Sequence, residues 1–269
     1  MTAKEDKMHQ KLSKSPITYV LAQVRFSTIQ SIGDYIPKLQ DEIRSFFPHF
    51  QKVNLQAIQL REDQQPISSV FNQWHFIDKD RQTGIILDNH SITIHTNQYS
   101  QFKPLIENLE KVLTRFNEIL KIVLFTRIGL RYINLIENGL DNIDIGLRGF
   151  QLKATNFEID KFLTKTETTQ LSNLGIIKIQ ATHVGNKEII SGTKNLYVPP
   201  DLVDAASVLT FQNYKVPDKD FLILDLDHFN EQQGDFDIDE ILHNFKEFQE
   251  IIYQVFCNAV GEQNLKNWA

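Results

Sequence analysis

The chain has little of what marks a secreted, membrane-spanning or cysteine-rich protein. Its single cysteine, Cys257, excludes an internal disulfide and a cysteine-rich zinc module. No apolar run approaches the roughly 18 residues of a transmembrane helix, and the polar residues 1–15 lack the apolar core of a secretory signal. We therefore expect a cytoplasmic protein in which Cys257 is a buried, inert thiol.

The sequence also lacks the standard motifs of enzymes. Its 11 glycines are scattered and form no phosphate-binding loop, dinucleotide fingerprint or nucleophile elbow. The eight histidines show no His-Glu-x-x-His spacing and no tight cluster with the cysteine, so we predict neither a metal site nor a cofactor. These absences count against enzymes that bind nucleotide cofactors through standard motifs, but they leave an unusual enzyme open.

The composition that is present is typical of a globular protein, with 41% hydrophobic and 23% charged residues in a chain of 269. A net charge of −6 argues against nonspecific binding to nucleic acid. The charge is unevenly distributed, because residues 218–240 contain nine acids and one lysine. This segment therefore carries −8, and the rest of the chain carries +2.

The periodicity of apolar residues predicts the secondary structure. Alternation with a period of two predicts strands, among them residues 17–26, 84–87, 91–96, 123–136 and 221–229, and a hairpin of 174–184 with 188–196. Helical spacing predicts long amphipathic helices near residues 32–47, 101–121 and 238–259. Ser31, Ser100 and Asp237 are the predicted caps of these helices.

These elements predict an α+β fold in two loosely repeated halves that resemble helix-grip units. A tail over residues 1–15 precedes an N-terminal half over 16–137 and a C-terminal half over 138–269, and the two could form one continuous body. Each half places antiparallel strands before a long helix. Because a sheet with one apolar face needs such a cover, we expect each sheet to be covered by its own helix.

Residues 127–134, Arg-Ile-Gly-Leu-Arg-Tyr-Ile-Asn, form the most informative stretch. Gly129 and Arg131 would share one strand face, and Tyr132 would lie on the other. An arginine beside a glycine suggests a close backbone approach or a cation held for a partner. Arg131 and Tyr132 could bind an anion or stack on a ligand; alternatively, Arg131 forms a salt bridge across the sheet to Asp225 or Glu137.

Asp225 and Asp227 place two carboxylates on one strand face. Such a pair could hold a divalent cation, or its two carboxyls could have different pKa values and act as acid and base. The alternative is a solvated strand face without a catalytic role. If the protein is an enzyme, we expect metal-dependent hydrolysis or phosphoryl transfer at these aspartates, with Arg131 stabilising negative charge.

The acidic segment is the predicted docking site for another protein with a basic surface. Residues 221–229 could also be an edge strand that pairs with a partner. The alternative is a solubilising loop with acids at a helix N-terminus. Trp74 could be a ligand platform or a core residue. The acids expected to contact the partner are Asp218, Asp220, Asp235, Asp237 and Asp239.

Six segments carry a family resemblance: residues 17–26, 74–80, 94–99, 128–134 and 224–227, and Phe256. Together they resemble a sporadically distributed bacterial family of similar length and unknown function. The patchy distribution of that family implies horizontal transfer, which is compatible with defence or toxin–antitoxin roles. We therefore expect a non-enzymatic partner- or ligand-binding protein, an accessory or neutralising component of such a system.

Overall fold

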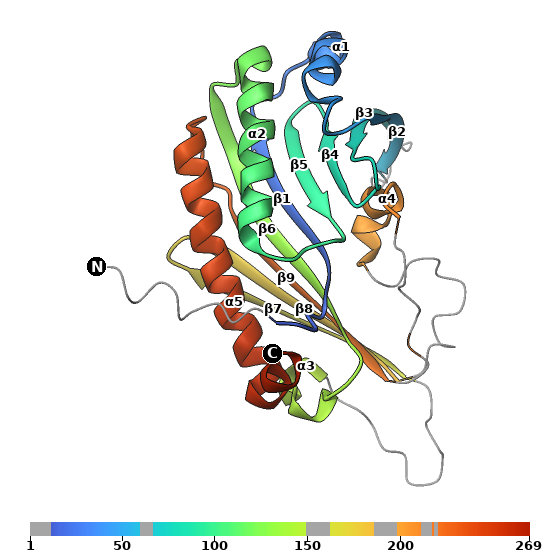
Figure 1. Cartoon of the computed structure of the whole chain (residues 1–269), viewed down its shortest axis with the longest axis vertical. Helices are drawn as coiled ribbons and strands as arrows, with labels where there is room; N and C mark the ends of the chain where they lie inside the picture. Colours follow the sequence, from blue (N-terminus) through green and yellow to red (C-terminus); the bar gives the residue numbers. More distant parts are fainter. Residues whose placement is uncertain (1–11, 60–66, 149–161, 186–197, 211–216, 218–219) are drawn as a thin grey trace.

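One large antiparallel sheet organises the molecule (Figure 1). The computed structural model describes residues 12–59, 67–148, 162–185, 198–210, 217 and 220–269. Within these residues ten strands form the sheet, in the order β2-β3-β4-β5-β1-β6-β9-β8-β7, and the short β10 also pairs with β6. The centre of the sheet is therefore built from β1, β6 and β9.

The described strands and helices have the following bounds. The strands are β1 Ile17–Phe26, β2 His49–Gln59, β3 Ile67–Ile77, β4 Thr83–Leu87, β5 Ser91–Thr96, β6 Leu124–Ile136, β7 Leu163–Ser172, β8 Gly175–Val184, β9 Phe221–Asn230 and β10 Gly234–Asp235. The helices are α1 Ile32–Ile43, α2 Phe102–Leu120, α3 Ile145–Arg148, α4 Val203–Ser207 and α5 Ile238–Trp268, with short 3-10 turns η2 Leu140–Asn142 and η4 Pro200–Leu202.

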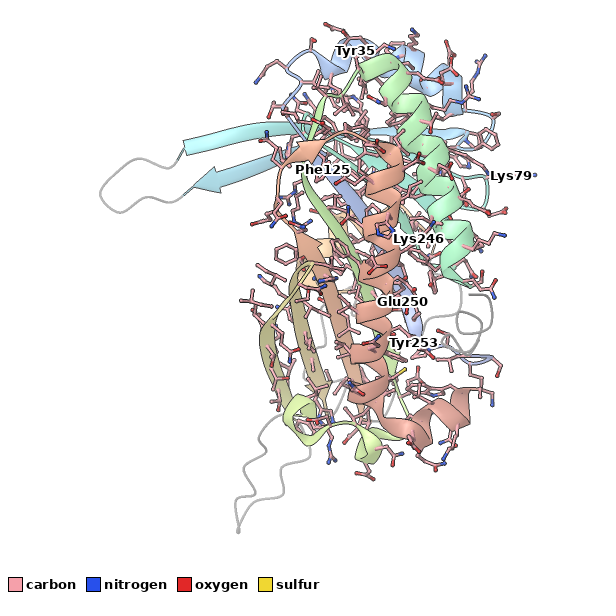
Figure 2. All side chains as sticks on the ribbon, turned by 90° about the vertical axis from the view of Figure 1, so that its left-hand side faces the viewer. Tyr35, Lys79, Phe125, Lys246, Glu250 and Tyr253 are labelled. Atoms are coloured by element: carbon pink, nitrogen blue, oxygen red, sulfur yellow. The ribbon has the colours of Figure 1, made fainter. Side chains whose placement is uncertain are left out.

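The three long helices α1, α2 and α5 lie on the same face of the sheet (Figures 1 and 2). Alternation along the strands explains why, because every second residue of a strand points to one face. In β1, Val20, Ala22 and Val24 are buried towards the helices, whereas Gln23 and Arg25 point to the opposite face and stay partly exposed. The apolar stripes of α2 and α5 complete this main core.

The opposite face of the sheet is apolar at one end and charged over its centre. At the apolar end, Tyr19, Ile133 and Phe221 pack against Leu202 and Ala206 from the η4–α4 segment, and these residues form a second, smaller core. The β2–β3 hairpin projects away from the helices on this side (Figure 2). A row of charged side chains occupies the centre of this face, on the side of the sheet opposite the three long helices.

The prediction of separate sheets, each covered by its own long helix in two repeated halves, is wrong. β6 pairs with β1 on one edge and with β9 on the other, so the strands on both sides of residue 137 belong to one sheet. One long C-terminal helix, α5, packs beside α2 against that sheet. The local pattern of a strand run followed by a helix cannot distinguish two small sheets from one continuous sheet, because both need the same apolar stripes.

Two further predictions concern β8 and β9. β8 lies between β7 and β9, and residues 188–196, its predicted hairpin partner, lie outside the described residues. β9 is the predicted edge strand, but it lies inside the sheet between β6 and β8. Among the described helices, none combines the length and the apolar character that a membrane span requires.

Candidate functional site

Arg131 is held between two carboxylates on the open face of the sheet. Its Nε and Nη2 donate to the two oxygens of Asp225 at 2.8 and 2.7 Å, and its Nη1 donates to Asp201 at 2.6 Å. Burial lowers the pKa of Arg131, but the hydrogen bonds and charges of Asp225 and Asp201 outweigh it and leave the pKa above its usual value. The predicted alternative of a salt bridge across the sheet is therefore present, with Asp225 rather than Glu137 as the partner.

Gly129 leaves room for the second arginine of the motif, Arg127. A Cβ atom on Gly129 would lie 2.7 Å from Nη1 of Arg127, so any other residue here would force this guanidinium to shift. Arg127 also donates to Gln23 Oε1 at 3.1 Å and lies 4.5 Å from the ring centroid of Phe229. The group that closely approaches Gly129 is therefore a side chain of the same strand, the Arg127 guanidinium, and not a ligand or a partner.

Asp225 and Asp227 lie on one strand face, as their spacing predicts, but they pair with different arginines. Asp225 contacts Arg131, and Asp227 lies 3.6 Å from Arg127. Burial raises the pKa of both carboxyls, and the facing arginines oppose this rise. No group of three potential metal ligands from His, Cys, Asp and Glu is found among the described residues.

The acidic segment is divided between the interior and the surface. Asp225 is buried in its ion pair, and Asp237 caps α5 by accepting a hydrogen bond from the Glu240 N–H at 3.1 Å. Asp220, Asp235 and Asp239 are exposed, whereas Asp218 lies outside the described residues. Part of the predicted charge therefore neutralises arginines within the sheet. Asp235 and Asp239 lie at the start of α5, whereas Asp220 precedes β9 at the other end of the sheet.

Tyr132 and Trp74, the other predicted binding residues, point towards the helices. Trp74 is 6% exposed and packs near Gly33 of α1, so it belongs to the core. Tyr132 follows Arg131 and therefore points to the opposite face, where it lines a cavity between α2, α5 and β6. Arg131 and Tyr132 thus contribute to different sites.

This cavity, called here the tyrosine pocket, has a volume of about 460 Å³. Its walls come from the β5–α2 loop, the first turn of α2, the helix-side face of β6 and β9, and the middle of α5, which Figure 2 marks with Glu250 and Tyr253. The described lining residues are Leu12, Ser15, Ile17, Tyr99, Ser100, Gln101, Phe102, Lys103, Tyr132, Asn134, Leu226, Gln249, Ile252, Tyr253 and Phe256.

Two tyrosines join at one side of the pocket. The Tyr132 hydroxyl donates to the Tyr99 hydroxyl at 3.2 Å, and the rings pack edge to face with centroids 5.2 Å apart. Burial raises the pKa of Tyr99 to about 12 and raises that of Tyr132 well above its usual value. Both phenols therefore stay protonated at neutral pH and can act as hydrogen-bond donors.

A segment before β1 closes one side of the tyrosine pocket. Leu12 and Ser15 line the cavity, and the residues between them are tied to the end of α5: the Lys14 N–H donates to the Trp268 carbonyl at 3.0 Å, and the Ser13 hydroxyl donates to the Ala269 carbonyl at 2.8 Å. The Trp268 ring in turn stacks on Phe256, another wall residue. The closing segment is thus connected to the C-terminal end of α5, whose Trp268 packs on the pocket wall at Phe256.

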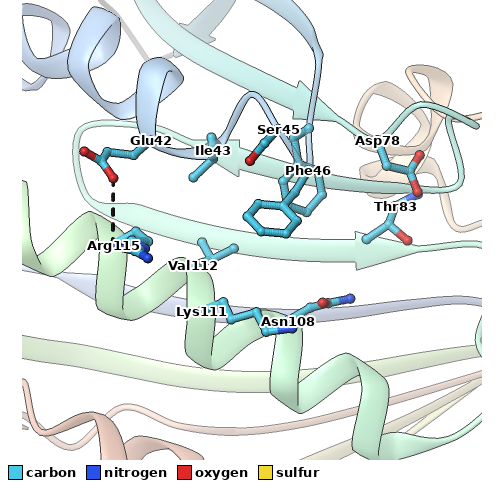
Figure 3. Close-up of a pocket in the computed structure, with 11 residues that line it drawn as sticks. Glu42, Ile43, Ser45, Phe46, Asp78, Thr83, Asn108, Lys111, Val112 and Arg115 are labelled. Carbon is cyan, nitrogen blue, oxygen red and sulfur yellow. Dashed lines mark hydrogen bonds and ion pairs between the residues drawn. The ribbon is translucent and has the colours of Figure 1, made fainter.

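A second cavity of about 570 Å³ lies between α1, α2 and the β3–β4 turn (Figure 3). The ring of Phe46 points into it and is 65% exposed, and an ion pair of 3.9 Å joins Glu42 to Arg115 at its rim. Asp78, its most enclosed acid, already accepts hydrogen bonds from the N–H groups of Gln82 and Thr83. Its remaining charged groups are exposed rim side chains, so the tyrosine pocket has the better set of sheltered, convergent groups.

Sequence reasoning identified one residue of the tyrosine pocket, Tyr132. The other walls come from segments far apart in the chain, and their apolar residues follow the same stripes as ordinary core positions. One local signal was available, because Tyr99-Ser100-Gln101 is a polar stretch directly before a long helix. Comparison of the sequence with protein-family models gave no match, and comparison with curated proteins gave none either.

Proposed function

We propose that this chain is a non-enzymatic binding protein whose ligand occupies the tyrosine pocket. The observation that carries the proposal is a cavity of about 460 Å³ with apolar walls and a few hydroxyl and amide groups. Ligand sites typically have volumes of about 300–1,000 Å³ and this mixture of linings. The charged residues considered for catalysis support the same proposal, because each is engaged in an ion pair: Asp225 with Arg131, and Asp227 with Arg127.

The biological setting is proposed from the family resemblance alone. A role as an accessory or neutralising component of a bacterial defence-type or toxin–antitoxin system fits a binding protein without standard catalytic motifs. A cytoplasmic location agrees with that role.

A protein partner with a basic surface is the second candidate ligand. It is favoured by the exposed acids at the start of α5, where Asp235 and Asp239 form no ion pair within the described residues. A field of one sign would accelerate association with a partner of the opposite sign. The two proposals concern different surfaces, so each can be tested without disturbing the other.

A variant that fills the tyrosine pocket tests the leading proposal. Gln249 lines the cavity and is half-buried, so Gln249→Trp should occupy its volume, whereas Gln254→Trp places the same side chain on an exposed position of α5. A small-molecule extract of bacterial cells should raise the melting temperature of the wild type and of Gln254→Trp, because a ligand that binds only the folded state stabilises it. Gln249→Trp should show no such rise. An equal rise in all three proteins would place the ligand elsewhere.

A further inference from the structure

The tyrosine pocket has hydrogen-bond donors at one end and apolar walls along the rest, and this arrangement favours one chemical class of ligand. We propose that it takes an amphipathic carboxylate, with the head group at the Tyr99 hydroxyl and the apolar body along β9 and α5. This inference rests on the proposed binding function and adds the chemical class of the ligand.

The charge of the lining favours an anion. Of the described residues that line the pocket, Lys103 alone is charged, and no carboxylate is among them. Lys103 lies at the mouth, with its side chain 82% exposed and 3.8 Å from Glu107. An anionic head group would thus enter without facing a like charge in the lining, whereas an ammonium group would meet Lys103 and no counter-charge.

Hydrogen-bond donors also converge on the polar end of the cavity. Because the Tyr99 hydroxyl accepts from Tyr132, its own proton is left for another acceptor, and none is found for it among the described residues. The neighbouring N–H groups of Phe102 and Lys103 open α2 and have no carbonyl one turn earlier to bond. Gln101 at the N-cap provides no side-chain hydrogen bond, so these donors are not satisfied by a cap.

The remaining walls suit an apolar body. Leu226, Ile252 and Phe256 lie on the sheet and α5 side, Leu12 comes from the segment before β1 that closes the cavity, and Ile17 is the first residue of β1. Contact with such walls removes the apolar part of a ligand from water, which provides affinity without selecting a head group. The head group therefore determines specificity, and the body determines strength.

Three probes with the same straight chain separate these contributions: octanoate, octanol and octylammonium. Calorimetric titration of the full-length protein at neutral pH should show octanoate binding about tenfold more tightly than octanol, since hydrogen bonds to a charged acceptor exceed those to a neutral one. Octylammonium should bind more weakly than octanol. The Tyr99→Phe variant should bring octanoate and octanol to nearly equal affinity, whereas Tyr35→Phe, on the exposed face of α1, should retain the tenfold ratio.

A second pair of variants keeps the test independent of the folding of Tyr99→Phe. Lys103→Gln should weaken octanoate but not octanol, and Lys111→Gln on the same helix should change neither. Equal affinities of the three probes for the wild type, or a preference for octylammonium, would overturn the carboxylate assignment and leave the binding function standing. Failure of all three probes would also overturn it, while the Gln249→Trp comparison with cell extract would decide the binding function separately.

Discussion

At the scale of single residues, the charged row on the open sheet face acts as part of the structure. The Asp225 side chain is 4% exposed, and Arg131 is its hydrogen-bonded counter-charge. Removing one member of a buried ion pair costs more than the pair contributes, because the other charge remains in a poorly solvated position. Arg131, the most conspicuous residue of the 127–134 motif, is therefore expected to matter first for stability.

Arg131→Met should lower the free energy of unfolding by about 3–5 kcal/mol at neutral pH, because it leaves the Asp225 carboxylate buried without its partner. Urea denaturation measures this value. The matched variant Arg115→Met removes an exposed arginine with an ion pair of 3.9 Å and should cost less than about 1 kcal/mol. The loss of unfolding free energy in Arg131→Met should become smaller as the pH falls, since Asp225 then becomes neutral. A loss as small as that of Arg115→Met at neutral pH would contradict a structural role for Arg131.

Three buried histidines predict how stability depends on pH. Burial lowers the pKa of His75 and His228 to about 4, and burial together with His75 lowers that of His95 to about 3. The unfolded chain, in which their pKa is about 6.5, therefore binds more protons between these limits. The stability that they contribute is complete above pH 6.5 and is lost as the pH falls towards 4.

Asp225 and Asp227 oppose this dependence, because their raised pKa values favour the folded state at low pH. The variant His75→Gln isolates the histidine effect: the fall in unfolding free energy between pH 6.5 and 4 should be less steep than in the wild type. His243→Gln, at an exposed position of α5, should leave the steepness unchanged. Identical pH profiles for the wild type and His75→Gln would refute the assignment.

At the scale of the elements, local chemistry in the sequence identified most strands and helices but not all of their ends. Strand β1 and the three long helices were predicted close to their observed positions, because alternation and helical spacing are local signals. β7 was missed, since its residues, Leu-Thr-Lys-Thr-Glu-Thr-Thr-Gln-Leu-Ser, lack the alternation of apolar and polar residues. Its threonines are β-branched, however, and that is the signal that could have revealed it.

Helix caps give a direct comparison of a correct and an incorrect prediction. Asp237 caps α5 through its side chain, whereas Ser31 occupies the N-cap of α1 without a side-chain hydrogen bond. Asp237→Ala should therefore cost about 1 kcal/mol of unfolding free energy, and Ser31→Ala should cost much less. Thermal or urea unfolding of both variants provides the measurement, and equal losses would be inconsistent with the observed cap geometry.

At the scale of the whole molecule, the sequence could not show how the strands are ordered. Pairing between β6 and β9 joins residues about 90 positions apart in the chain, and no local pattern records such a pairing. The tyrosine pocket was beyond reach for the same reason, since it exists only where α2, α5 and β6 meet. Residue types predicted which surfaces are charged or apolar, but the topology determined which of them face one another.

Charge reversal at the start of α5 tests the proposed protein partner. Asp235→Lys with Asp239→Lys should slow association with a basic partner, and the difference should shrink as salt is added, because screening weakens charge–charge attraction. Asp34→Lys, in the first turn of α1, is a matched control that should leave the rate unchanged. Partner capture followed by stopped-flow or surface-based kinetics gives the rates. Unchanged association of the double variant at low salt would rule out this surface.

The most direct test of a ligand-binding function is the mass of the folded protein itself. The wild-type chain, purified without denaturation from cells that normally make it, should be heavier by native mass spectrometry than after denaturation, by the mass of one small molecule. Gln254→Trp should retain this added mass, and Gln249→Trp, which fills the tyrosine pocket, should lose it. Equal native and denatured masses for the wild type, or the same added mass in Gln249→Trp, would contradict the proposed function.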